Sequence, residues 1–164
     1  MLSETLEARC FDLMKQATTM TLATSADDVP WATDVYFVNV GFDLCFVSST
    51  NSRHCANLKQ NPVCAATVHA QASDWKTIRG LQFEGRAEHS AAAGVLGLLV
   101  PYFEKFPFAR AVYVGLAEGA GVSKLAVYKL ETGTVFYIDN ARGFGSKFSC
   151  RVADGRPIEA FARI

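Results

Sequence analysis

Residues 50–55, Thr-Asn-Ser-Arg-His-Cys, place several anion-binding groups in one short polar segment. The segment lies between an apolar run and a short helical pattern, so we expect Ser52 to cap a helix whose first turn contains Arg53. That turn carries unpaired amides and partial positive charge, which makes a cation unfavourable there unless an anion is bound. With the hydroxyl of Ser48, at the end of the preceding run, these groups would suit a phosphate.

A purely structural interpretation of Arg53 is equally open at this point. The short helix can lie on the surface, with the guanidinium paired to an acidic side chain or simply solvated. The types and order of these residues do not separate that role from a phosphate site.

The nearby histidines and cysteines do not form a metal-binding pattern. The spacing of His54, Cys55, Cys64 and His69 matches none of the paired Cys/His motifs, and the two cysteines fall on different predicted elements. We therefore predict no metal site. We interpret His69 as a hydrogen-bonded histidine of a strand.

Size and charge restrict the kind of partner. The chain has 164 residues, with 16 basic and 16 acidic side chains and a pI near 6.8. This length fits one domain, residues 1–164. The charges are balanced, so the sequence does not indicate binding to nucleic acid or to an anionic membrane. We expect the partner to be a small molecule.

The cysteines and the apolar runs bear on location. Five cysteines, an odd number at irregular spacings, indicate reduced thiols and a cytoplasmic protein. The N-terminal residues carry acidic side chains, unlike a signal peptide, and the longest apolar run, 91–103, is interrupted by Gly and Pro. We predict no membrane span.

The elements that must position the polar segment are mostly strands. Runs rich in β-branched and aromatic residues predict strands at 19–24, 30–40, 43–49, 63–70, 77–89, 125–131 and 134–140. Helices are expected at 3–16, with Ser3 as the cap, and at 90–105, and residues 132–133 are expected to form a turn. The resulting class is mainly β: a six- to seven-stranded antiparallel barrel with flanking helices.

The order of these pieces resembles the FMN-binding split-barrel family of pyridoxamine 5'-phosphate oxidase-like proteins. The segments that carry the resemblance are "TDVYFVNV", "LCFVSS", "TNSRHCANLKQNP", "VCAATVHA" and "IRGLQFEGRAE". The resemblance implies a dimeric antiparallel barrel that holds FMN at the subunit interface. It places the family's phosphate-binding serine, arginine and lysine at Ser52, Arg53 and His54, and the strand-end residues beside the flavin at Val47 and Ser48.

The sequence departs from the oxidase in three respects. His54 stands where the oxidase has lysine, Gly80 stands where it has a flavin-contacting glutamine, and its substrate-binding ending is not recognisable. The chain therefore looks closer to an uncharacterised branch than to the vitamin B6 enzyme, and we assign no catalytic residue.

The strand expected at 30–40 supplies two further candidates. In relatives this strand runs beside the flavin ring, so the resemblance makes Thr33 and Asp34 cofactor-binding candidates. An aspartate at a hairpin edge is an equally good interpretation of Asp34.

Three functions fit these observations. The leading one is an FMN-binding protein acting as a flavin-dependent oxidoreductase on an unknown small molecule. The second is a flavin carrier or sensor without turnover. The third is a haem-binding split barrel, which would take its axial ligand from His54, His69 or His89. A hydrophobic content of 50%, with many bulky aromatics, also predicts a homodimer.

Overall fold

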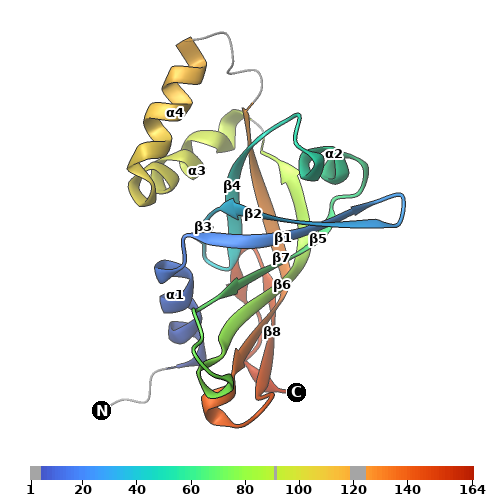
Figure 1. The fold of residues 1–164 in the computed structure, drawn as a ribbon, viewed down its shortest axis with the longest axis vertical. Coiled ribbons are helices and arrows are strands. Elements are labelled where there is room, and N and C mark those ends of the chain that lie inside the picture. Colours follow the sequence, from blue (N-terminus) through green and yellow to red (C-terminus); the bar gives the residue numbers. More distant parts are fainter. Residues whose placement is uncertain (1–4, 91, 119–124) are drawn as a thin grey trace.

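The computed structural model describes residues 5–90, 92–118 and 125–164, which form a curled antiparallel sheet and four helices (Figure 1). Its main path runs β10-β8-β7-β6-β5-β1-β2. The strands of this path are β1 (Thr19–Ala26), β2 (Val29–Tyr36), β5 (Val63–His69), β6 (Arg79–His89), β7 (Leu125–Asp139), β8 (Lys147–Ala153) and β10 (Ala162–Arg163). The predicted class, a mainly β fold with a six- to seven-stranded antiparallel barrel and flanking helices, is confirmed.

Three short strands lie off this path. β4 (Asp43–Ser49) pairs with β7 and with β3 (Val38–Val40), and β9 (Arg156–Pro157) pairs with β8. β6 borders β7 along nearly its whole length, whereas the other edge of β7 pairs first with β4 and then with β8. This change of neighbour bends the sheet into a half-barrel.

The turn expected at 132–133 does not exist, and β7 runs straight through it. The amide of Thr132 donates to Asp43 Oδ1 at 3.0 Å, and its hydroxyl donates to the carbonyl of Phe42 at 2.7 Å. Thr132–Gly133 therefore marks the point where β7 stops pairing with β4 and starts pairing with β8. On the opposite edge, the pairing of β7 with β6 shifts register between Glu84 and Gly85. Threonine and glycine serve this irregularity as readily as they serve a hairpin.

The strand expected at 30–40 is also divided. β2 ends at Tyr36 and β3 begins at Val38, with the fully buried Phe37 between them. The Phe37 amide still donates to the carbonyl of Thr18 beside β1, whereas from Val38 onward the chain pairs with β4. Strands β8, β9 and β10 were not predicted. The glycine-bearing tail expected after residue 140 returns to the sheet through them.

Four helices flank the sheet: α1 (Leu6–Gln16), α2 (Arg53–Gln60), α3 (Ala92–Lys105) and α4 (Pro107–Glu118). Thr5 caps α1, and the predicted cap Ser3 lies outside the described residues. α3 passes through Pro101 without ending, and α4 was not predicted although Pro107 occupies a first helical position, where proline is favoured. In Figure 1, α3 and α4 form a hairpin that projects from the sheet.

The main hydrophobic core lies between the sheet and the helices α1 and α2. Its largest fully buried side chains are Phe37, Phe42, Phe46, Phe83, Met14, Met20, Leu22, Leu44, Leu81 and Leu130. All five cysteines are buried and free. Over the ranges that the structure describes, no helix is long and apolar enough to cross a bilayer.

Candidate functional site

The predicted helix after β4 is α2, and its first turn is firmly placed. Ser52 is the N-cap, with its hydroxyl accepting from the amide of Cys55 at 3.4 Å. Farther along, the buried amide of Asn57 donates to Thr24 Oγ1 at 3.1 Å, which ties α2 to β1. The start of α2 is therefore held beside the end of β4, and a helix start presents unpaired amides to any anion bound there.

Three polar side chains converge at this point, which we call the Ser–His cluster: Ser48, Ser52 and His54. His54 Nε2 lies 2.6 Å from Ser48 Oγ and 3.1 Å from Ser52 Oγ, and the two hydroxyls are 3.4 Å apart. The imidazole is buried, with 8% of its residue surface exposed. Because serine hydroxyls both donate and accept, the cluster can turn donors toward an incoming oxyanion without moving its backbone.

Arg53 lies at the surface beside the cluster. Its guanidinium carbon stacks 4.3 Å from the centre of the Trp31 ring on β2. Among the residues that the structure describes, no carboxylate lies within ion-pair distance of it. Arg53 therefore does not form the ion pair that the structural interpretation allowed. Because the guanidinium is stacked on a ring, its N–H groups can still donate hydrogen bonds to an anion.

Val47 and Ser48 are neighbours in sequence but not in space. Strand alternation puts Ser48 on the Ser–His side of β4 and Val47 on the opposite face. There Val47 packs against an apolar cluster that includes Tyr102 and Phe106 of the helical hairpin. Only the backbone of Val47 can contribute to a site that contains the Ser48 side chain.

Thr33 and Asp34 lie on β2, apart from the cluster. Asp34 is exposed and its Oδ1 accepts from the hydroxyl of Thr21 across the β1–β2 pair at 2.6 Å. Thr33 is half-buried and shares the strand face of Trp31, two residues before it. The structure thus links β2 to α2 through the Trp31–Arg53 stack, while Asp34 has a partner of its own.

Two neighbours of the cluster were missed by sequence reasoning, Cys55 and Tyr128. The Cys55 thiol is buried, which opposes ionisation, but hydrogen bonds from His54, Ser52, Tyr128 and Ser48 lower its pKa to about 7. Burial raises the pKa of Tyr128, and its contact with Cys55 raises it further. Tyr128 reaches the cluster because it pairs with Phe46 in the β4–β7 ladder, and no local pattern reveals that pairing.

A pocket of about 690 Å³ opens beside the first turn of α2. Its lining combines apolar and polar side chains of α2, β6 and β7: Thr50, Cys55, Ala56, Leu58, Lys59, Pro62, Ala87, Glu88, His89 and Tyr128. His89 and Tyr128 lie edge to face, with ring centres 5.8 Å apart. The polar cluster and this pocket share the helix start, so one bound molecule could contact both.

A curled antiparallel sheet with a short helix, α2, between the strands β4 and β5 defines the split-barrel class of fold. Residues 6–139 match the pyridoxamine 5'-phosphate oxidase family, and the chain belongs to that family. The UPF0306 protein PM1958 of Pasteurella multocida is 26% identical over 151 residues, which cover 89% of this chain and 92% of that protein.

Two solved structures share the fold. The haem-binding protein of Mycobacterium smegmatis superposes with a TM-score of 0.70 at 20% identity, covering 92% of this chain but only 59% of that protein. The haem storage protein HutZ of Vibrio cholerae gives a TM-score of 0.65 at 20% identity, covering 78% of this chain and 90% of that protein. At these identities the likeness concerns the fold alone.

Proposed function

We propose that the protein binds FMN, with the phosphate at the start of α2 in contact with Ser48, Ser52, Arg53 and His54. The observation that carries this proposal is the convergence of two hydroxyls and an imidazole nitrogen within 2.6–3.4 Å of one another. Beside them lies an arginine that has no carboxylate partner among the residues described by the structure. A dianion there would meet the helix amides, three polar side chains and a cation.

The remaining candidates would contact the rest of the cofactor. Thr33 and Asp34 on β2, and the backbone of Val47 on β4, would lie along the flavin ring. FMN would supply the electron transfer of a flavin-dependent oxidoreductase acting on a small molecule, while the protein supplies position and charge. Turnover with a reductant and an acceptor separates this activity from that of a flavin carrier or sensor.

Titration of FMN and riboflavin by fluorescence quenching tests the phosphate site. Losing one charge-assisted partner typically removes ~1.5–3 kcal/mol, so Arg53→Ala should weaken FMN roughly ten- to a hundredfold and leave riboflavin nearly unaffected. Arg86→Ala, at another exposed arginine, is the control and should change neither. Equal losses for both flavins would assign Arg53 to the fold, and no loss would put the phosphate elsewhere.

The pocket beside α2 supports haem as a second candidate ligand. Of the three histidines, His54 is already engaged by two serines, and His69 and His89 are both exposed. His89 is the one that lines the 690 Å³ pocket. His89 is therefore the residue that fits an axial ligand. The spectrum of the purified protein distinguishes the two: flavin bands support FMN, whereas a Soret band that is lost in His89→Ala but not in His69→Ala supports haem.

We further propose that the protein is a homodimer with the flavin site at its interface. Tyr36 of β2 and Phe108 of α4 lie edge to face, 5.3 Å between ring centres, and are 45% and 55% exposed. Val100 and Val112 of the same hairpin are also exposed. Such an apolar surface favours association. Light scattering that finds a monomer with FMN still bound would contradict a site built across the interface.

The thiols support a reducing compartment, and we infer the cytoplasm. Five buried cysteines remain free, and disulfides are not used to hold this fold together. Denatured protein isolated without reductant should therefore react with five equivalents of maleimide. Fewer equivalents would indicate oxidation and would weaken the inference.

A further inference from the structure

Another pocket lies between α1, β3 and the C-terminal end of α3. Its volume is about 420 Å³, within the range of roughly 300–1,000 Å³ that is usual for small-molecule sites. None of its lining residues belongs to the Ser–His cluster or to the pocket beside α2. Apolar and charged side chains share the lining: Phe11, Val38 and Pro101 are apolar, and Lys15, Glu104 and Lys105 are charged.

Lys105 reaches this pocket from the last residue of α3, and it is half-buried. Its Nζ donates to the carbonyl of Met14 at 3.0 Å. The same atom lies 4.3 Å from the centre of the Phe37 ring and 5.5 Å from the centre of the Phe106 ring. In the part of the chain that the structure describes, no carboxylate lies within ion-pair distance of Lys105.

These surroundings favour the neutral amine more than is usual for a lysine. Burial lowers the pKa of Lys105 to about 8, because a charge loses its hydration there. The two rings attract a cation only weakly by comparison. The charged groups that line the pocket from the packed elements, Lys15 on α1 and Glu104 on α3, have opposite signs, and β3 contributes none. A neutral amine that donates one N–H to Met14 keeps its lone pair for a reaction.

We propose that this pocket binds a small uncharged aldehyde, which Lys105 converts to an imine. The amine nitrogen adds to the carbonyl carbon, and a C=N bond forms while the carbonyl oxygen leaves as water with two protons from the nitrogen. The step needs no oxidant or reductant. The opposite charges of Lys15 and Glu104 suit a ligand without net charge, and the apolar side chains accept a short alkyl chain. A protonated imine still has one N–H for the carbonyl of Met14.

Trapping with butanal and cyanoborohydride at pH 7, followed by digestion and mass spectrometry, tests the proposal. At this pH the neutral fraction of an amine with a pKa of about 8 is roughly three hundredfold that of an ordinary lysine. Half-burial and lower basicity reduce this advantage, so Lys105 should gain a butyl group at least roughly tenfold faster than Lys76 or Lys129. Equal rates at the three lysines would overturn the proposal.

The two reference lysines separate the possible causes of a fast reaction. Lys76 is exposed, with its Nζ 5.5 Å from the centre of the Trp75 ring, so it controls for a ring contact without burial. Lys129 is half-buried like Lys105, but its Nζ lies 2.8 Å from Asp43 Oδ2. It therefore controls for partial burial with a carboxylate partner.

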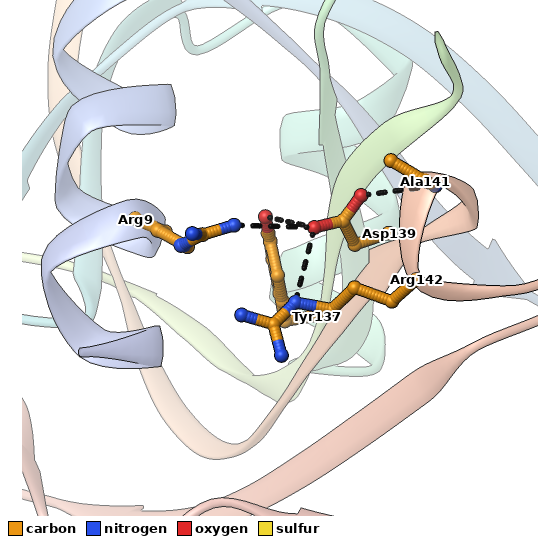
Figure 2. A network of polar contacts seen from close by, with 5 residues as sticks. All are labelled: Arg9, Tyr137, Asp139, Ala141 and Arg142. Carbon is orange, nitrogen blue, oxygen red and sulfur yellow. Dashed lines mark hydrogen bonds and ion pairs between the residues drawn. The ribbon is translucent and has the colours of Figure 1, made fainter. Parts of the chain in front are cut away.

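Lys105→Arg keeps a positive charge and an N–H donor but cannot form an imine. It should remove the fastest phase of butyl incorporation, and an unchanged fast phase would overturn the proposal. α1 keeps another anchor in this variant, because Arg9 Nη1 lies 3.5 Å from Asp139 Oδ2 on the sheet (Figure 2).

The charges that line the pocket should set its selectivity between aldehydes. Glu104→Gln leaves Lys15 unopposed, so glyoxylate, an anionic aldehyde, should gain on butanal by roughly two- to fivefold at Lys105 but not at Lys76. Lys15→Gln should shift the ratio in the opposite direction. The ratio of the two aldehydes cancels any change in the amine itself. Unchanged ratios at Lys105 in both variants would put the aldehyde outside this pocket and overturn the proposal.

Discussion

The molecule has two polar centres, which differ in the chemical groups that they bring together. The Ser–His cluster at the start of α2 joins hydroxyls, an imidazole and a nearby thiol, with no carboxylate among them. The centre around Asp139, at the far end of β6 and β7, joins a buried carboxylate to two guanidinium groups, a phenol and an amide.

The difference shows how a buried polar group is stabilised with or without a ligand. A buried carboxylate must be paired in the folded chain itself, so the Asp139 centre is complete and holds α1 to the sheet. Hydroxyls and imidazole can satisfy one another and can also turn toward an anion. We infer that the Asp139 centre maintains the fold and that the Ser–His cluster receives a ligand.

The largest expected contrast concerns two cysteines. Cys55 and Cys64 are both buried, with 2% and 7% of their surface exposed, but burial raises the pKa of Cys64 to about 12 whereas hydrogen bonds lower that of Cys55 to about 7. Because the thiolate is the nucleophile, and a thiolate of lower pKa is intrinsically less reactive, Cys55 should react with iodoacetamide at pH 8 roughly thirty- to a hundredfold faster. Mass spectrometry of timed digests measures both rates.

The rate of Cys55 alkylation should depend on pH in a defined direction. Alkylation of Cys55 should fall as the pH drops through about 7, because the thiol becomes protonated. Tyr128→Phe removes one hydrogen-bond donor and should move that midpoint upward. Faster alkylation of Cys64, the more exposed of the two, would mean that exposure decides reactivity and would place Cys55 outside the polar cluster.

The next contrast compares the buried carboxylate of Asp139, at the end of β7, with the exposed carboxylate of Asp34 on β2. Asp139→Asn removes the charge that orients Arg9 and Arg142, and it should lower the free energy of unfolding by about 2–3 kcal/mol. This figure is below the value for a fully buried pair because both arginines are partly exposed. Asp34→Asn, at an exposed carboxylate, should cost under about 0.5 kcal/mol. Urea unfolding measures the free energy of unfolding of both variants. Similar losses in the two would contradict a structural role for Asp139.

The fold could be predicted from the sequence wherever the signal was local. Alternating runs identified β1, β4, β5 and β6, and the polar segment before residue 53 identified the start of α2. Irregular positions failed: Thr132–Gly133 has the composition of a turn but marks a change of strand partner. Whether Thr132–Gly133 forms a turn or a change of strand partner depends on the pairing of β7 with β4 and β8, which is not visible in the local sequence.

The site was predictable to the same extent. Ser48, Ser52 and His54 were proposed from the capping pattern and the family resemblance, and the structure brings all three together. Tyr128 was missed because its place beside the cluster arises from the β4–β7 pairing, whereas Cys55, next to His54 in sequence, was considered only as a metal ligand. The opposite orientations of Val47 and Ser48 follow from strand alternation, a signal present in the sequence but not used.

A smaller contrast compares two helix caps. Ser52 caps α2 and Thr5 caps α1, each through one hydroxyl that accepts from an amide three residues later. Replacing either by Ala should lower the free energy of unfolding by about 1 kcal/mol. Only Ser52→Ala should also weaken FMN, by several-fold, because only Ser52 belongs to the Ser–His cluster. A matching loss of FMN affinity in Thr5→Ala would show that both effects come from general destabilisation.

The smallest predicted effect concerns the stack of Arg53 on Trp31. A cation over an exposed aromatic ring contributes about 0.5–1 kcal/mol, so Trp31→Leu should weaken FMN roughly two- to fivefold by releasing the guanidinium. Riboflavin should bind as before, because it lacks the phosphate that Arg53 is proposed to hold. Fluorescence titration of both flavins measures the two changes.

A double-mutant cycle decides whether Trp31 acts through Arg53. If the ring only positions the guanidinium, Trp31→Leu should have no further effect on FMN in the Arg53→Ala background, and the coupling should equal the whole effect of the single variant. Additive losses would mean that Trp31 contacts the cofactor independently, and weaker riboflavin binding would locate that contact at the flavin ring. In that case β2 contributes an aromatic surface to the site, and the start of α2 is only part of the binding region.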